Sequence, residues 1–264
     1  MVYAIAMVKN EADIVAETVG HMCSQVDKVV VADNGSTDGT REILSGLPVT
    51  LIDDPEVGYY QSRKMTRLAE LCREAGADWI VPFDADEIHM SHEDRIADLL
   101  TALPADVLIS EAPLFDHVAT AKDIGFTPLE RMGYRRAAPA PLRKIAVRAV
   151  EGVTIHQGNH SAEFPGVASP KTVTNLIEVR HFPYRSVEQF VSKVRHGAAA
   201  YAASDLPEDV GAHWRQYGRI LDERGEDGIA EIFHTWFYRE HPDREAVIGS
   251  EQQPPLVYNP CLTS

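Results

Sequence analysis

Residues 79–87 read Trp-Ile-Val-Pro-Phe-Asp-Ala-Asp-Glu. The first five residues are a short apolar run, and three of the next four are carboxylates. A run of this length is typical of a strand buried inside a sheet. A second run, KVVVA at residues 28–32, is followed in the same way by DNGSTDG at 33–39. Because neither run alternates with polar residues, the two predict parallel strands covered on both faces.

Similar apolar runs recur along the chain and are separated by segments with the apolar spacing of helices. In the first half we expect further strands at 3–8, 49–52 and 106–110, and helices at 12–26, 40–44, 60–75 and around 96–100. In the second half we expect strands at 144–150, 153–157 and 173–179, helices at 186–203, 209–224 and 227–239, and an extended tail from residue 251. Strands that alternate with helices predict an α/β fold.

Local signals indicate where several of these helices begin or end. Ser91 to Asp94 and Ser186 with Gln189 both fit capping boxes, and Gly76 is placed to stop the helix at 60–75. In the 33–39 segment we expect Ser36, Thr37 or Asp38 to cap the helix that follows.

The composition is that of an ordinary globular protein with an acidic balance. The 264 residues include 40 Asp or Glu against 25 Lys or Arg, a formal net charge of −15, with 44% hydrophobic residues. This balance argues against a protein that coats nucleic acid or an anionic membrane. The first apolar run lacks a basic leader, no stretch approaches the roughly 18 apolar residues of a membrane span, and Cys23, Cys72 and Cys261 form no CxxC pair. We therefore expect a cytoplasmic protein without a membrane span and with reduced thiols.

The ends of the expected strands are unusually rich in charged residues. They carry Lys9-Asn10-Glu11, Asp33-Asn34, Asp53-Asp54 and Asp84-Ala85-Asp86-Glu87. Right-handed crossovers bring the carboxyl ends of parallel strands to one edge, where open α/β sheets bind their ligands. Converging carboxylates repel each other, and a bound divalent cation is the simplest compensation.

Two of these strand ends suggest a specific chemistry. If the backbone is extended, Asp84 and Asp86 point the same way and can bind Mg²⁺ or Mn²⁺, although a D-x-D triplet alone is a weak signal. Asp33 follows a buried strand and can accept an N–H from a nucleobase or a hydroxyl from a ribose. The first strand is followed by VKNEAD, which has no glycine, so a Rossmann dinucleotide site is disfavoured.

The segments VKNEADIVAETVGHMCSQVDKVVVADNGSTDGTREIL (8–44) and ADWIVPFDADE (77–87) resemble the nucleotide-sugar-binding half of family 2 glycosyltransferases of the GT-A fold. The resemblance covers roughly residues 1–115, and KNE together with HFPYRS (181–186) is similar to a bacterial subgroup of small soluble members. It implies an open, mixed, mainly parallel sheet flanked by helices, with a helical C-terminal extension. We expect a catalytic domain at 1–182, with a nucleotide-sugar half at 1–115 and an acceptor half at 116–182, and an extension at 183–264 that packs on the core.

The resemblance also implies site residues. Donor-binding roles fall on Lys9, Asn10, Glu11, Asp33, Asn34, Arg63, Asp84, Ala85, Asp86 and Lys193, with Asp33 holding the base and Arg63 and Lys193 near the diphosphate. Asp84, Asp86 and His181 form the implied ligand set for Mn²⁺ or Mg²⁺. A structural role for His181 in the turn before Pro183, and ordinary solvated positions for Arg63 and Lys193, remain open.

The implied reaction is inverting, metal-dependent transfer of a hexosyl-type sugar, most simply from a UDP-sugar, to an acceptor hydroxyl. The acceptor is a glycan, a lipid-linked molecule or a small molecule. A base must remove the acceptor proton, and Glu111, Asp116, His160 and Glu163 all qualify, with Glu163 and His160 preferred. The alternatives are a sugar-phosphate nucleotidyltransferase, which normally needs a Gly-rich basic loop after the first strand, and a non-catalytic nucleotide-sugar-binding protein.

Segment 131–150 contains six Arg or Lys and no acid. Three interpretations remain open for it: a solvated linker followed by an amphipathic strand, a mobile lid over the diphosphate, and a site for an anionic acceptor. The C-terminal helices suit either packing on the core or a homodimer.

Overall fold

A computed structural model describes residues 1–91, 94–243, 247–248 and 251–261. The chain divides into two compact units. Unit 1 contains residues 1–55, 61–115 and 139–181, and unit 2 contains residues 56–60, 116–138 and 182–264. The expected division into a catalytic domain at 1–182 and a helical extension at 183–264 stays a prediction, because it assigns functions to the two parts.

The centre of unit 1 is a seven-stranded sheet with the order β13-β6-β10-β4-β1-β2-β3. Its strands are β1 (Val2–Val8), β2 (Lys28–Asp33), β3 (Thr50–Asp53), β4 (Trp79–Pro82), β6 (Val107–Ala112), β10 (Lys144–Arg148) and β13 (Lys171–Thr174). Every neighbouring pair is parallel except that β10 runs antiparallel to both β4 and β6. The predicted α/β class with an open, mixed, mainly parallel sheet is confirmed.

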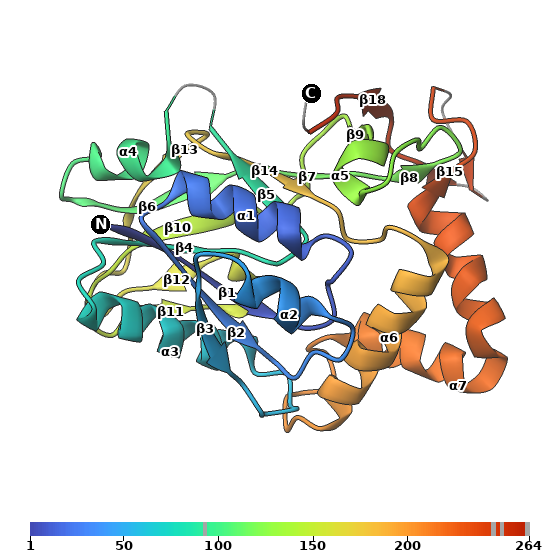
Figure 1. Cartoon of the computed structure of the whole chain (residues 1–264), viewed down its shortest axis with the longest axis horizontal. Helices are drawn as coiled ribbons and strands as arrows, with labels where there is room; N and C mark the ends of the chain where they lie inside the picture. The colour runs from blue at the N-terminus through green and yellow to red at the C-terminus, as the bar shows by residue number, and fades with distance from the viewer. Residues whose placement is uncertain (92–93, 244–246, 249–250, 262–264) are drawn as a thin grey trace. The chain divides into compact units, whose positions relative to one another are not determined.

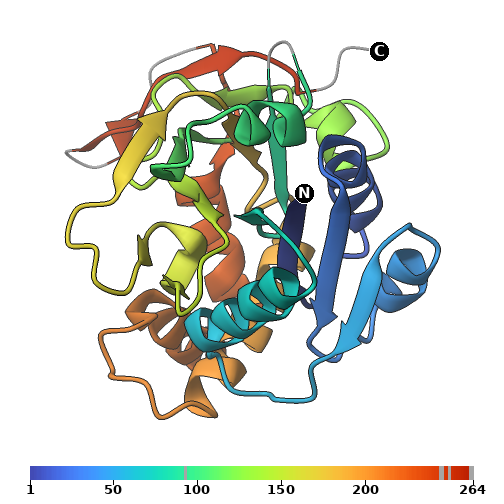
Figure 2. The same ribbon diagram turned by 90° about the vertical axis from the view of Figure 1, so that its left-hand side faces the viewer.

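Helices cover both faces of this sheet, as Figure 1 and Figure 2 show. One face packs on α1 (Val15–Gln25), α2 (Thr40–Ser45) and α4 (Ile96–Thr101), whose apolar residues share one core with alternate residues of the strands. The other face packs on α3 (Gln61–Glu74) and on the hairpin of β11 (Thr154–Ile155) and β12 (Ala162–Glu163). Burial on both faces explains why the central strands are apolar throughout.

A smaller sheet extends unit 1 beyond the end of β4. It has the order β5-β14-β7, formed by β5 (Glu87–Met90), β14 (Glu178–His181) and β7 (Leu114–Asp116). The run expected as one strand at 173–179 is therefore divided between β13 and β14, with a turn at Asn175 where φ is +65°. This division brings His181 opposite Glu87 in the β14–β5 register.

The predicted helix caps have mixed outcomes. Ser186 caps α6 (Val187–Ala202) by accepting from Gln189 N, but the Gln189 side chain accepts from Arg185 N rather than from Ser186 N. The box at 91–94 is wrong: α4 has Arg95 as its N-cap without a side-chain bond, and residues 92–93 lie outside the described part. Gly39 occupies the N-cap position of α2, but the Asp38 side chain accepts from Thr40 N, the first N–H of the helix, at 3.0 Å, so Asp38 supplies the capping hydrogen bond. Gly76 follows α3 with φ of +92°, as expected.

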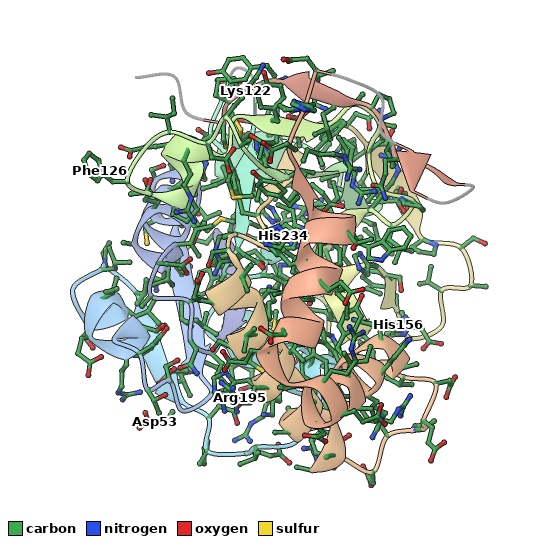
Figure 3. The ribbon with its side chains drawn as sticks, turned by 90° about the vertical axis from the view of Figure 1, so that its right-hand side faces the viewer. Asp53, Lys122, Phe126, His156, Arg195 and His234 are labelled. Atoms are coloured by element: carbon green, nitrogen blue, oxygen red, sulfur yellow. The ribbon has the colours of Figure 1, made fainter. Side chains whose placement is uncertain are left out.

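Unit 2 is largely helical. Its helices are α5 (Pro128–Arg131), α6 and α7 (Ala212–Ile232), and a π-helical turn, η2 (Phe233–Phe237), follows α7. Short strand pairs join β8 (Ala119–Thr120) to β15 (Tyr238–Arg239), β9 (Tyr134–Arg136) to β18 (Leu256–Tyr258), and β16 (Val247–Ile248) to β17 (Glu251–Gln252). The helical character predicted for the C-terminal part is confirmed. One loop of this unit exposes Phe126, which points into solvent in Figure 3.

No helix in the described part of the chain is long and apolar enough to cross a membrane. Within the same residues none of Cys23, Cys72 and Cys261 belongs to a disulfide, and burial raises the pKa of the Cys72 thiol to about 11.

Candidate active site

Two loops that follow β1 and β2 are joined into one rigid rim. Asn10 donates its backbone N–H to Ser36 Oγ at 3.0 Å, and its side-chain oxygen accepts from Thr37 N at 2.8 Å. Glu11 N donates to Thr40 Oγ1 at 2.8 Å. Asn10 has φ of +54°, a left-handed conformation that Asn tolerates better than most residues. The KNE and DNGSTDG motifs are therefore parts of one pre-formed structure.

Asp33 is the buried carboxylate of this rim. Its side chain is 3% exposed and accepts from Ser36 N and from an Arg41 Nη, each at 3.2 Å. The other Arg41 Nη contacts Asp53 Oδ1 at 2.6 Å, and the Asp53 side chain extends into solvent at the outer end of β3 (Figure 3). Arg41 is a site residue that the sequence reasoning missed, although its place at the start of the helix after Asp33 was a usable signal.

Asn34 and Asp54 form a second, neighbouring network. Asn34 Nδ2 donates to Asp54 Oδ2 at 2.9 Å, and the same oxygen accepts from Lys64 Nζ at 2.6 Å. The Lys64 and Asp54 side chains are only 10% and 14% exposed. Lys64 on α3 thus neutralises an acid at the end of β3, and the predicted donor-site residue Asn34 is fixed by that pair.

The D-x-D segment does not have the backbone that the sequence reasoning assumed. Glu87 N donates to Asp84 O at 3.1 Å, which closes a tight turn over residues 84–87. The expectation that Asp84 and Asp86 point the same way from an extended strand is therefore wrong, because β4 ends at Pro82. The turn instead places Asp84, Asp86 and Glu87 close to each other, with Asp86 and Glu87 buried.

A buried lysine neutralises this acidic turn. Lys144, at the start of β10, is 3% exposed, and its Nζ lies 2.6 Å from Asp84 Oδ2, 2.7 Å from Glu87 Oε1 and 2.9 Å from Gly158 O. Burial opposes ionisation of Lys144, but the two carboxylates dominate and raise its pKa. Burial likewise opposes ionisation of Glu87, yet Lys144 and His89 hold its pKa well below the usual range. The sequence showed Lys144 only as a member of the basic segment.

The second oxygen of Asp84 is also engaged. Its Oδ1 accepts from Gln61 Nε2 at 3.2 Å and from Asn159 Nδ2 at 3.1 Å. Gln61 in turn accepts from Gly158 N at 2.8 Å, so one side chain links α3, the acidic turn and the turn at 157–159. Burial and the charges of Glu87 and Asp86 raise the pKa of Asp84 in spite of Lys144.

Asp86 lies on the other side of the turn, close to His181. His181 Nε2 is 3.7 Å from Asp86 Oδ1, and the two side chains are 21% and 5% exposed. Within the described residues, no three His, Cys, Asp or Glu side chains gather into a metal-binding group. Carboxylate oxygens and an imidazole nitrogen still suit Mn²⁺ or Mg²⁺, ions that take one or two protein carboxylates together with substrate phosphates. The residues therefore fit a metal that is shared with a diphosphate.

Of the predicted bases, His160 lies beside this network, because its ring is next to Gly158. Its Nδ1 is 2.8 Å from Arg143 O, and because a carbonyl can only accept, Nδ1 carries the proton and Nε2 presents a lone pair. Burial, and then the charge of Lys144, lower the His160 pKa. The Glu163 side chain is 76% exposed and lies 3.7 Å from His156, which Figure 3 labels. Glu111 is partly buried on β6.

Other predicted residues have less defined surroundings. Lys9 is partly buried in the rim, and Arg63 is exposed on α3. Lys193 belongs to unit 2, where its Nζ donates to Pro183 O at 3.3 Å, and its role at a diphosphate stays a prediction. The lid interpretation is wrong for residues 144–148, because β10 is a central strand paired on both sides.

Residues 3–120 match the profile described as glycosyl transferase family 2. An uncharacterized glycosyltransferase of Rickettsia felis is 36% identical over 84 residues, which are 32% of this chain and 28% of that protein. A second from Rickettsia prowazekii is 30% identical over 95 residues, 36% of this chain and 31% of its own. The chain thus spans less than a third of the length of these relatives.

Two glycosyltransferases are among the solved structures to which this chain shows a similarity. A mannosyltransferase from Pyrobaculum calidifontis in complex with GDP-Man and Mn²⁺ has a TM-score of 0.40 and 16% identity, over 87% of this chain and 73% of that chain. A glucosyl-3-phosphoglycerate synthase from Mycobacterium tuberculosis in complex with Mn²⁺, UDP and phosphoglyceric acid has a TM-score of 0.40 and 12% identity, over 78% and 79%.

Proposed function

We propose that this protein transfers a sugar from a nucleoside-diphosphate sugar to an acceptor hydroxyl, because residues 3–120 match the profile described as glycosyl transferase family 2. We further propose that the donor is of the UDP type, that a divalent metal assists, and that the anomeric centre is inverted. The acceptor residues are proposed to come from segments beyond the matched region.

One observation carries the proposal. Asp33 is the last residue of β2 and Asp84 follows β4, and these two strands flank β1, so a buried acceptor for a base and a turn rich in carboxylates share one edge of the sheet. The rim formed by residues 10–12 and 36–40 is already hydrogen-bonded, so a nucleoside would bind to a pre-organised edge. This edge is where open α/β sheets bind ligands.

In this proposal Asp33 accepts the N–H of the base, and Arg41 shifts from Asp33 toward the ribose or phosphate side. Asp84, held by Lys144, Gln61 and Asn159, accepts a ribose hydroxyl. Asp86 and His181 would hold the metal, which when bound neutralises charge on the leaving diphosphate.

We propose His160 as the base that removes the acceptor proton. Its Nδ1 proton is committed to Arg143 O, so Nε2 is the nitrogen able to take a proton. Gly158 packs against the same ring: a Cβ on that residue would lie 2.5 Å from His160 Cδ2. The ring is therefore fixed by a backbone carbonyl and a glycine. Glu163 and Glu111 are the alternatives.

The test begins with binding and ends with transfer. Calorimetry with UDP, GDP and ADP, each with and without Mn²⁺, should show one nucleotide bound in the micromolar to low millimolar range, and the corresponding sugar nucleotide should be hydrolysed slowly. Absence of binding by every nucleoside diphosphate would refute the proposal. Binding without any turnover would instead support a nucleotide-sugar-binding protein, and pyrophosphate release from a nucleoside triphosphate and a sugar phosphate would support a nucleotidyltransferase.

A further inference from the structure

The surroundings of the Lys144 ammonium are those of a cation site. Three oxygens from two separate segments, the turn at 84–87 and the turn at 157–159, lie 2.6–2.9 Å from Nζ: Asp84 Oδ2, Glu87 Oε1 and Gly158 O. Two carboxylates and a backbone carbonyl are a ligand combination that proteins use for hard cations. Lys144 is 3% exposed and Glu87 is fully buried, so water screens the attraction between these two charges little, whereas the Asp84 side chain is 29% exposed.

The three oxygens stay in place because other bonds hold each segment. Glu87 Oε2 accepts from Asp84 N at 3.1 Å and lies 3.2 Å from His89 Nε2. Gly158 N is bonded to Gln61, and the neighbouring Asn159 is fully buried with φ of +60°. The cage therefore does not depend on Lys144 alone for its shape, and a vacated cage would keep its oxygens close together.

We propose that Lys144 is a tethered cation: it fills a cation site built by Asp84, Glu87 and Gly158, and thereby positions Asp84 as a hydrogen-bond acceptor. The strand β10 delivers this charge permanently, so a free metal ion does not enter the cage of the native protein. The role of the positioned Asp84 in donor binding rests on the proposed function, whereas the cation site does not.

The test compares two substitutions that remove the charge but differ in the space they leave. Lys144→Ala opens the cage, and Lys144→Met removes the charge while it fills most of the volume. Mn²⁺ without nucleotide is the probe, with the number of bound ions counted from the free-ion electron paramagnetic resonance signal. Lys171→Ala is the matched control, because Lys171 pairs with Asp106 at 2.7 Å on the surface.

We expect Lys144→Ala to bind one more Mn²⁺ per molecule than the native protein does, and to bind Mn²⁺ at least tenfold more tightly. Addition of Mn²⁺ should also raise the melting temperature of Lys144→Ala. Lys144→Met and Lys171→Ala should match the native ion count. An unchanged ion count in Lys144→Ala would overturn the proposal, as would an equal gain in Lys144→Met, since the ion would then lie outside the cage.

A second measurement covers the case in which Lys144→Ala folds poorly. The ion n-propylammonium has the atoms that this substitution deletes, so it should raise the melting temperature of Lys144→Ala and leave that of Lys144→Met unchanged. No rescue by either n-propylammonium or Mn²⁺ would contradict a cation site.

The positioning role has its own readout in the nucleotide affinity. Lys144→Met should weaken binding of the nucleotide that the native protein prefers by about tenfold, because Asp84 loses one of its three hydrogen-bond donors. Unchanged affinity would remove the positioning role. A native protein that binds no nucleotide would refute the proposed function and leave the ion count standing.

Discussion

The buried pair of Lys144 and Glu87 makes a quantitative prediction about stability. Lys144→Met leaves the fully buried Glu87 carboxylate without the ammonium that lies 2.7 Å from it. Removing one partner of a buried ion pair costs about 3–5 kcal/mol, because the remaining charge is uncompensated. For a unit of this size each kcal/mol lowers the melting temperature by about 2–4 °C, so we expect a fall of roughly 6–20 °C.

The double variant Lys144→Met/Glu87→Gln isolates the charge effect from the packing effect. Since it removes both charges, it should recover at least half of the lost stability, about 1.5–2.5 kcal/mol, and comparison with the single variant Glu87→Gln completes the double-mutant cycle. Urea unfolding followed by far-ultraviolet circular dichroism measures all variants. Lys171→Met should cost under about 1 kcal/mol, because that pair with Asp106 is exposed.

Two results would refute this reasoning. A loss below about 1 kcal/mol in Lys144→Met would mean that Glu87 is compensated by other groups, with His89 the nearest. A double variant no more stable than the single one would mean that packing of the lysine chain, and not its charge, is what matters.

Three further predictions concern the site. Asp33→Asn should weaken nucleoside-diphosphate binding roughly 10–100-fold in calorimetry, since a charged hydrogen bond to the base contributes about 1.5–3 kcal/mol; unchanged affinity would place the base elsewhere. His160→Ala should abolish transfer with donor affinity nearly unchanged. Because burial and Lys144 lower the pKa of His160, the transfer rate of the native protein should start to decrease only at a pH below about 6.5, the ordinary pKa of histidine. A Glu163→Gln variant with the same phenotype would instead identify Glu163 as the base. Gly158→Ala should reduce transfer and melting temperature together, because φ is +78° and the added Cβ meets the His160 ring; a neutral effect would show that the ring position is unimportant.

Acidity should also destabilise the protein through Glu87. Its folded pKa lies below its unfolded value, so the stabilisation is complete above about pH 4.5 and is lost as the pH falls through the folded pKa. The urea midpoint of the native protein should therefore decline below that pH more steeply than that of the double variant. Parallel declines would show that other carboxylates dominate.

Much of the site was readable from the sequence because it is made by local patterns. Apolar runs without polar alternation identified the strands, and the polar residues after them identified the edge where Asp33, Asp84 and Asp86 lie. The loop at 33–39 was recognised as turn and capping chemistry: Gly39 occupies the N-cap position, and the Asp38 side chain accepts from Thr40 N at the start of α2 and from Ala12 N. Such features depend on neighbours within a few residues, so a single sequence contains them.

The tertiary structure alone decided how the charges of the site are balanced. Lys144 is 60 residues from Asp84, and only the antiparallel insertion of β10 between β4 and β6 brings the two together. The sequence suggested a metal ion as compensation for the acidic turn, and the fold places a lysine there. Strand order and the turn at 84–87 result from burial of the whole sheet. This burial depends on contacts between residues far apart in the sequence, so no local pattern predicts it.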